Sequence, residues 1–532
     1  MSAVAAIVLA LLLCALGLPG PSESLATPAK SVVSGSHASG KKRPAPHPSS
    51  LPRLKAVPDP VNGGRIVDSK GRQVILRGVN VNSLGEYWQG KAISPVLPLD
   101  RRDPGRISRI GWNSVRLILS WSKVEPKPGE FNEKYLKTVS TWVKRFRDNG
   151  IYTIIDLHQD AWGATLAARP GESCPPAYQP AFGWDGAPGW ATFDGGLPHC
   201  FIGARETSPA VQNAWKSFFD DVPASDGVGI QTHYVNMLRK LARTFAKEKS
   251  VAGIDIMNEP GAFGPIPASD LSAFYARSVK SIRKGEKSGH GFRHLVFFEP
   301  SVLWSLVGNG APPPFTDDDQ IVYSPHLYGG SIGTEGPPSQ ASFETALAEA
   351  KTFGGAPLVT GEWGGNPARA THADDDYFLA HQALQDQYGI GATLWTWKQS
   401  CGDPHAATND PESAPSLPPW PVFTMDCSNG GNRIVGMNRD LVRDLRRGYV
   451  RKAPGKLVRS SWNPLSLTLT AEGKGARKNQ GRLEAFMPTQ GVTISRRGLT
   501  GYRLRKLGSG SVISFQPTDG KWRLKVHQVF IR

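Results

Sequence analysis

Two glutamates in this 532-residue chain each follow directly on a short apolar run. Glu259 stands in "GIDIMNEP", beside the amide of Asn258, and Glu362 stands in "VTGEWGG". A carboxylate at the end of a buried segment is costly unless it has a partner or a chemical task. Two carboxylates that flank one bond are the arrangement used in glycoside hydrolysis. We therefore predict that Glu362 is a nucleophile and that Glu259 is the acid/base, with a pKa raised by burial and like charge.

Seven further side chains lie in or directly after other apolar runs, and we expect them to surround the two glutamates. They are Arg116 in "NSVRL", His158 and Asp160 in "DLHQD", Asn258 beside Glu259, His326 and Tyr328 in "SPHLYG", and Trp395 in "LWTWK". We expect Arg116 and Tyr328 to hydrogen-bond Glu362 and keep it ionised, and Asn258 to bind a sugar hydroxyl. The indole of Trp395 is expected to stack on the sugar, with Trp397 on the same face.

Eight short apolar segments alternate with amphipathic stretches. We expect these segments to be strands and helices that bring the residues named above together. The expected strands are Val74–Val81, Ser114–Leu119, Tyr152–Leu157, Gly253–Met257, Leu295–Phe298, Ile321–Ser324, Pro357–Thr360 and Gly391–Trp397. The expected helices are Glu133–Asn149, Gln231–Lys247, Ser269–Lys284, Ser342–Phe353 and Asp374–Tyr388. This alternation predicts a (β/α)8 barrel, in which catalytic residues lie at the carboxyl ends of the strands. The longest insertion runs from about Ala161 to Gly227.

The helical period ends near Ser460, where short runs such as "SLTLTAEG" and "WRLKVHQVFI" alternate apolar and polar residues. This pattern predicts a small C-terminal β-sandwich. We expect a signal peptide over residues 1–26, a flexible basic linker rich in Pro and Ser over 27–57, the catalytic barrel over 58–452 and the sandwich over 453–532.

The first residues and the cysteines both indicate export. An apolar run from Ala3 to Leu18 is followed by a small-residue site at Ser24-Leu25-Ala26, which is typical of a secretory signal. An uncleaved anchor is the alternative, so we expect a secreted or envelope-associated protein. The mature chain keeps Cys174, Cys200, Cys401 and Cys427, which allow three disulfide connectivities, and sequential pairing is our choice.

Positive charge is concentrated at the ends of the chain, although the whole carries a formal net charge of +17. Residues 451–532 hold 17 Lys or Arg and 3 Asp or Glu. This distribution does not indicate a nucleic-acid enzyme. It suggests peripheral contact of the C-terminal domain with an anionic membrane or envelope surface, the alternative being a merely soluble basic domain. No cysteine or histidine spacing indicates a metal, and we expect a monomer.

The motifs "SVRLILSW", "DLHQD", "IMNEP", "PHLYG", "GEWGG" and "LWTWK", in this order, resemble glycoside hydrolase family 5. "LRGVNVN", "DLHQDAWG" and "GIDIMNEPGAF" narrow the resemblance to the endoglycoceramidase branch. It covers roughly residues 60–450 and implies cleavage of the β-linkage between an oligosaccharide and ceramide, without metal or organic cofactor. It also implies the roles given above to Glu259, Glu362 and the seven supporting residues.

A lipid substrate needs an apolar approach to the site. The candidates are Phe182, Trp184, Trp190, Phe193, Phe263, Pro265, Leu303, Trp304 and Leu306. The alternative for each is packing within the long loops. For the whole chain, the alternatives are the same chemistry on a polysaccharide such as a β-glucan or mannan, and a binding protein that has kept the barrel.

Overall fold

The computed structural model describes residues 51–87, 93–261, 267–308, 310–331, 338–365, 373–403, 422–428 and 431–529. Its centre is a parallel sheet of eight strands in the order β11-β10-β9-β6-β5-β4-β13-β12. The strands are β4 (Arg77–Val81), β5 (Ser114–Ser120), β6 (Tyr152–His158), β9 (Val251–Asp255), β10 (Leu295–Phe298), β11 (Ile321–Tyr323), β12 (Val359–Trp363) and β13 (Gly391–Leu394). A parallel bridge between Tyr323 and Leu358 joins the two ends of this order, so the strands run round a barrel. The predicted (β/α)8 fold is confirmed.

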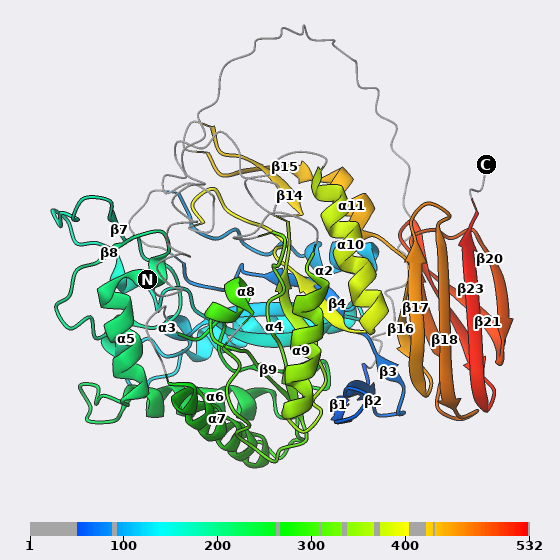
Figure 1. Ribbon diagram of the computed structural model, residues 1–532, viewed down its shortest axis with the longest axis horizontal. Helices are drawn as coiled ribbons and strands as arrows, with labels where there is room; N and C mark the ends of the chain where they lie inside the picture. The colour runs from blue at the N-terminus through cyan, green and yellow to red at the C-terminus, as the bar shows by residue number, and fades with distance from the viewer. Residues whose placement is uncertain are drawn as a thin grey trace, which may run out of the picture.

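Helices cover the outside of the barrel (Figure 1). They are α2 (Asp103–Ile110), α3 (Trp121–Val124), α4 (Glu133–Asp148), α5 (Pro209–Phe219), α6 (Ile230–Phe245), α7 (Ala268–Ser288), α8 (Leu303–Val307), α9 (Gln340–Thr352), α10 (Ala373–Tyr388) and α11 (Arg439–Leu445). The side chain of Asn132 caps α4, and the helix buries Leu136, Val139, Val143 and Phe146 at the spacing of one helical face. Within the described ranges, no helix has both the length and the apolar character that crossing a membrane requires.

The insertion between β6 and α6 contains α5, three short 3-10 helices and the small hairpin β7 (Gln179–Pro180) and β8 (Cys200–Phe201). The 3-10 helices are η1 (Ala164–Leu166), η2 (Gly189–Ala191) and η3 (Arg205–Thr207). A disulfide joins Cys174 to Cys200 within this insertion, and a second joins Cys401 to Cys427. The sequential pairing predicted from the sequence is confirmed.

Two antiparallel sheets form the C-terminal sandwich, which stands beside the barrel in Figure 1. One has the order β17-β18-β23-β20 and the other ends in β16-β19-β22-β21. These strands are β16 (Tyr449–Ala453), β17 (Lys456–Asn463), β18 (Thr468–Ala476), β19 (Leu483–Met487), β20 (Val492–Arg497), β21 (Leu499–Leu507), β22 (Gly510–Pro517) and β23 (Gly520–Gln528). Leu469, Trp522 and Leu524 of one sheet meet Ile513 and Phe515 of the other in a shared core. A separate hairpin, β14 (Phe423–Asp426) and β15 (Arg433–Met437), precedes α11.

The first residues that the structure describes extend the sandwich sheet, so the expectation of a flexible linker over residues 27–57 is wrong for Leu54–Val57, which form a strand. Strands β1 (Leu54–Val57), β2 (Arg65–Asp68) and β3 (Gln73–Val74) continue it, because β3 pairs with β16. The expected first barrel strand, Val74–Val81, is therefore divided. Val74 belongs to the sandwich sheet, Ile75 packs in the sandwich core, and the barrel strand begins at Arg77.

Candidate active site

The carboxyl ends of the barrel strands bring the two glutamates together. Glu362 lies within β12, and Glu259 follows the end of β9 by four residues. The imidazole of His326 lies between them, with Nδ1 at 2.8 Å from Glu259 Oε1 and 3.5 Å from Glu362 Oε2. Because one nitrogen contacts both carboxylates, these two oxygens lie at most about 6.3 Å apart. The two glutamates therefore face a common space, as the sequence predicted.

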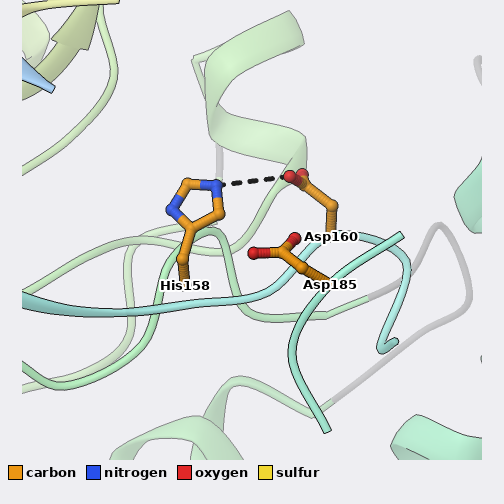
Figure 2. Close-up of side chains that lie close together, drawn as sticks. All are labelled: His158, Asp160 and Asp185. Carbon is orange, nitrogen blue, oxygen red and sulfur yellow. Dashed lines mark ion pairs between the residues drawn. The ribbon is translucent and has the colours of Figure 1, made fainter. Parts of the chain in front are cut away.

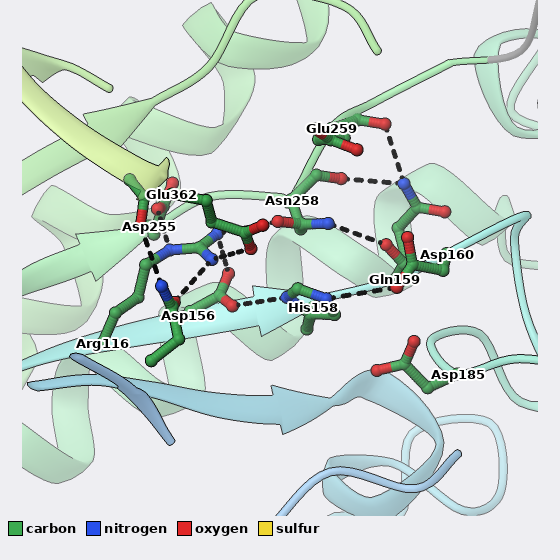
Figure 3. A network of polar contacts seen from close by, with 12 residues as sticks. Arg116, Asp156, His158, Gln159, Asp160, Asp185, Asp255, Asn258, Glu259 and Glu362 are labelled. Carbon is green, nitrogen blue, oxygen red and sulfur yellow. Dashed lines mark hydrogen bonds and ion pairs between the residues drawn. The ribbon is translucent and has the colours of Figure 1, made fainter. Parts of the chain in front are cut away.

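Arg116 on β5 is the buried cation beneath this pair (Figure 3). Its Nη1 donates to Glu362 Oε1 at 2.8 Å, and its Nη2 donates to Asn258 Oδ1 at 3.0 Å. The hydroxyl of Tyr328 donates to Glu362 Oε2 at 3.0 Å. Both oxygens of Glu362 thus accept a hydrogen bond, and the contacts predicted for Arg116 and Tyr328 are present.

Glu299 is a member of the site that the sequence analysis missed. Its Oε1 lies 2.8 Å from Arg116 Nη2 and 3.2 Å from His326 Nε2, while its Oε2 accepts from the backbone N–H of Glu259 at 2.9 Å. The signal was available, because Glu299 directly follows the apolar strand β10, as Glu259 follows an apolar run. Asp156 on β6 and Asp255 at the end of β9 also pair with Arg116, and the sequence analysis missed them as well.

The backbone of Glu259 is held in a strained conformation. Its φ is +35°, in the left-handed region that a residue with a side chain rarely adopts. The carboxylate of Glu299 accepts its N–H, and Gln159 Nε2 donates to its carbonyl at 2.9 Å. Gln159 also donates to the carbonyl of Asn258 at 2.8 Å. Strain that several hydrogen bonds maintain in this way is typical of functional positions, and here it fixes where the Glu259 carboxylate points.

The protonation of the pair differs from the expectation. Burial raises the pKa of Glu259, but the hydrogen bond from His326 and the charge on that ring outweigh it, so the pKa lies below the ordinary value. Burial disfavours the charged form of His326, yet Glu299, Glu362 and Glu259 raise its pKa well above the usual range. The predicted raised pKa of Glu259 is therefore wrong for the free protein, because His326 holds the proton instead.

Glu362 shows the opposite shift. Burial raises its pKa above the ordinary value, although the charges of His326, Arg116 and His158 oppose that effect. Arg116 and Tyr328 were expected to keep this carboxylate ionised, and the charge of Arg116 does act to lower its pKa. Burial has the larger effect, and the sequence alone did not reveal how deeply Glu362 is buried.

His158 and Asp160 form the adjoining wall of the site. His158 Nδ1 lies 2.8 Å from Asp156 Oδ2, and its Nε2 lies 3.3 Å from Asp160 Oδ2. Asp160 also pairs with Arg205 from the insertion. The ring of Trp395 stacks on that of His158, with centroids 5.4 Å apart and an interplanar angle of 15°. Trp395 therefore lies at the site, as predicted.

His158, Asp160 and Asp185 are close enough in space to suggest a metal site (Figure 2). Both ring nitrogens of His158 are already engaged by carboxylates. Burial lowers the pKa of His158, but the charges of Asp156 and Asp185 outweigh it and raise the pKa well above the usual range. A metal needs the neutral imidazole, so we interpret this cluster as a charged hydrogen-bond network.

Trp397 does not share the face of Trp395. It is fully buried and packs edge-on against Trp112 and Phe423, at centroid distances of 6.5 Å and 5.0 Å. The expectation was wrong because β13 ends at Leu394, so the alternation of a strand does not extend to Trp397.

Most of the aromatic residues considered for a lipid approach are tied into the loops. Trp190 Nε1 donates to the carbonyl of Glu125 at 3.1 Å, and Trp304 Nε1 donates to Glu349 at 2.8 Å. Phe182 stacks on Trp184, while Phe193 packs on the barrel core. Leu303 is half-buried. Phe263, Pro265 and the side chain of Leu306 lie outside the described residues.

Comparisons with known proteins agree with this geometry. A family model described as "Cellulase (glycosyl hydrolase family 5)" matches residues 67–400. A crystal structure of an endogalactoceramidase is 35% identical, with a TM-score of 0.78, and the match covers 90% of this chain and 100% of that chain.

Two curated relatives are more distant. Endoglycoceramidase I of Rhodococcus hoagii (strain 103S) is 24% identical over 290 residues, which is 50% of this chain and 52% of the relative. Endoglycoceramidase of Hydra vulgaris is 26% identical over 288 residues, which is 49% of this chain and 53% of the relative. The chain thus spans about half the length of these curated relatives.

Proposed function

This chain belongs to glycoside hydrolase family 5, in its endoglycoceramidase branch, and we propose that it is a retaining endo-β-glycosidase acting on glycosphingolipids. It cleaves the bond between the intact glycan and ceramide. The observation that carries the proposal is the contact of one His326 nitrogen with both Glu259 and Glu362, which limits two of their oxygens to about 6.3 Å. Carboxyl groups about 5–5.5 Å apart accompany retention, whereas inversion needs about 6.5 Å or more to admit water.

In the first step Glu362 attacks the anomeric carbon and the bond to the ceramide oxygen breaks. The leaving oxygen needs a proton, and the His326–Glu259 pair supplies it. His326 Nδ1 holds that proton 2.8 Å from Glu259 Oε1, so the proton passes to the carboxylate and then to the leaving oxygen. The products of this step are free ceramide and a glycosyl ester on Glu362.

In the second step Glu259 accepts a proton from water, and the resulting hydroxide attacks the same carbon. The ester bond breaks, Glu362 leaves as a carboxylate, and the sugar keeps its β configuration. Ser305 Oγ donates to Glu259 Oε1 at 2.7 Å and orients the carboxylate in both steps. Arg116 and Tyr328 stabilise Glu362 when it is released.

Polar groups beside Glu259 and Glu362 recognise the sugar. Asn258 is fixed because its Oδ1 accepts from Arg116 and its Nδ2 donates to the carbonyl of Gln159 at 3.0 Å. This places the amide next to Glu259 for contact with the sugar 2-hydroxyl, which strengthens in the transition state. The stacked rings of Trp395 and His158 offer a flat, partly apolar platform for the sugar.

The proposed lipid substrate is supported by relatives named endoglycoceramidase and endogalactoceramidase. Since the 35% identical relative carries the second name, a galactose-linked ceramide is the first substrate to test. Export of the chain is part of the proposal and is supported by the two disulfides, which persist in oxidising compartments. Detection of the processed protein outside the producing cells tests it.

The experiment incubates the purified protein with galactosylceramide or lactosylceramide in detergent micelles, and mass spectrometry follows the products. Wild type is expected to release an intact glycan and free ceramide, and Glu362→Gln is expected to release neither. Cleavage of β-glucan or of an aryl β-glycoside without release from lipid would reject the glycolipid proposal and retain the two-carboxylate chemistry.

A further inference from the structure

A groove of about 1230 Å³ lies between the barrel and the sandwich. Gly105, Ser108 and Arg109 of α2 and residues 148–150 at the end of α4 line one side, and strands β16, β19, β21 and β22 line the other. Gly150 lies two residues before β6 begins. The groove is therefore at the amino ends of the barrel strands, whereas Glu259 and Glu362 lie at the carboxyl ends.

The lining of the groove is strongly basic. It contains seven arginine and lysine residues and two acidic residues. Both acids already have partners, because Glu484 pairs with Lys452 at 3.2 Å and with Arg72 at 3.3 Å, and Asp148 pairs with Arg147 at 3.0 Å. No arginine of the groove forms an ion pair with a carboxylate within the described part of the chain, although the charge of Glu484 acts on Arg482 and Arg505.

The arginines lie on the sheet face that turns away from the sandwich core. On this face Ser514 of β22 is paired with Arg503 of β21, and Val512 is paired with Arg505. Arg482 donates through Nε to Ser514 Oγ at 3.0 Å, which brings it next to Arg503. Burial and the charge of Arg503 lower the pKa of Arg482, and burial and the charge of Arg451 lower the pKa of Arg505. Two pairs of guanidinium groups are therefore close enough to repel each other.

Arg451 on β16 gives the second indication of a ligand. It is 5% exposed, and within the described ranges its Nη2 makes one long contact, of 3.4 Å, with the carbonyl of Gly150. Its Nε and Nη1 have no hydrogen-bond partner among the described residues. Buried N–H donors of a charged side chain normally have hydrogen-bond acceptors. Because two donors of Arg451 have none, this guanidinium group lacks an anionic acceptor.

We propose that this groove binds a phosphate group. One of its oxygens accepts from an unpartnered donor of Arg451, Nε or Nη1, and its negative charge relieves the repulsion between Arg451 and Arg505 and between Arg482 and Arg503. Guanidinium groups suit phosphate because they donate two parallel hydrogen bonds. The phosphate comes from a lipid headgroup at a membrane surface or from a soluble phosphate, and the site is independent of the proposed hydrolase activity.

The test measures binding of inorganic phosphate to the full chain by calorimetry, at constant ionic strength. The main variant is Arg503→Gln/Arg505→Gln, since both side chains lie on the sheet face that turns away from the sandwich core and their replacement leaves that core intact. A second variant, Arg451→Met, removes the buried donors. The matched control is Arg523→Gln/Lys525→Gln on β23, which removes the same charge from exposed positions of the other sheet.

Phosphate affinity is expected to fall at least tenfold in the Arg503/Arg505 variant and to stay within twofold of wild type in the control. Equal losses in both double variants would overturn the proposal, because net charge alone would then explain the binding. Absence of binding to phosphate, and to vesicles of phosphatidylglycerol in phosphatidylcholine, would also overturn it.

Vesicles distinguish the two sources of phosphate. If wild type floats with phosphatidylglycerol vesicles and the Arg503→Gln/Arg505→Gln variant does not, the ligand is a lipid headgroup. If wild type binds phosphate but does not float with the vesicles, the ligand is a soluble phosphate. Equal flotation with charge-matched vesicles of oleate in phosphatidylcholine would contradict the assignment to phosphate.

Discussion

The buried residue His381 on α10 makes the stability of this protein depend on pH in a predictable direction. It is fully buried, its Nε2 donates to the carbonyl of Leu327 at 3.1 Å, and its Nδ1 accepts from Gln385 at 3.0 Å. Burial lowers its pKa to about 3, with a contribution from the charge of Arg447. Leu327 lies between His326 and Tyr328, so His381 supports the segment that carries two site residues.

The size of the effect follows from the two pKa values. An unfolded histidine has a pKa of about 6.5 and the folded one about 3, so the unfolded state binds the proton first as the pH falls. Stability is therefore lost as the pH decreases from 6.5 towards 3. Between pH 7 and pH 5 the folded ring stays neutral, and the unfolded state gains about 2 kcal/mol from protonation of this one group.

The assay compares urea unfolding of wild type and His381→Gln at pH 7 and pH 5, followed by tryptophan fluorescence. Glutamine keeps an N–H donor for the Leu327 carbonyl but does not titrate. Wild type is expected to lose about 2 kcal/mol more than the variant between the two pH values. The other histidines are common to both proteins, so the difference isolates His381. Parallel pH dependence in the two proteins would refute the reasoning.

Three further predictions concern single contacts. Tyr328→Phe removes one hydrogen bond to the nucleophile and is expected to lower kcat/KM about ten- to hundredfold without a change in urea midpoint, as steady-state kinetics would measure. Replacing both cysteines of the Cys401–Cys427 disulfide by serine opens a loop with a sequence separation of 26 and is expected to cost about 3.5 kcal/mol in urea unfolding. The ion pair with Arg283 at 2.7 Å lowers the pKa of Asp318 to about 2 against the effect of burial, so its stabilisation is present above pH 4 and lost towards pH 2. Asp318→Asn is therefore expected to cost up to about 2 kcal/mol at pH 7 and almost nothing at pH 2, and unfolding at both pH values tests this.

The sequence predicted the positions of the site because a barrel converts sequence order into spatial order. Glu259, His326 and Glu362 are far apart in the chain, yet each lies at the carboxyl end of a strand, where a parallel barrel collects such residues. Apolar runs were sufficient to find the strands. The same reasoning would have found Glu299, had every strand end been examined.

Features that depend on packing between distant segments were not predictable. The pairing of β3 with β16 joins strands that precede the barrel to the sandwich, and no local pattern reveals such a partner. The proton held by His326 depends on three carboxylates that are far apart in the chain, Glu259, Glu299 and Glu362. Trp397 packs against Trp112 and Phe423 because β13 ends three residues before it, and strand boundaries are poorly determined by sequence.

The most direct test of the central claim is the anomeric configuration of the glycan at the moment of its release from the lipid. Proton NMR during the first minutes of hydrolysis of a β-linked glycosylceramide by wild type distinguishes the two anomers before they interconvert. The account predicts the β anomer of the intact glycan, since Glu362 forms a glycosyl ester that water then opens. Initial release of the α anomer would contradict the assignment of Glu362 as nucleophile and the double displacement.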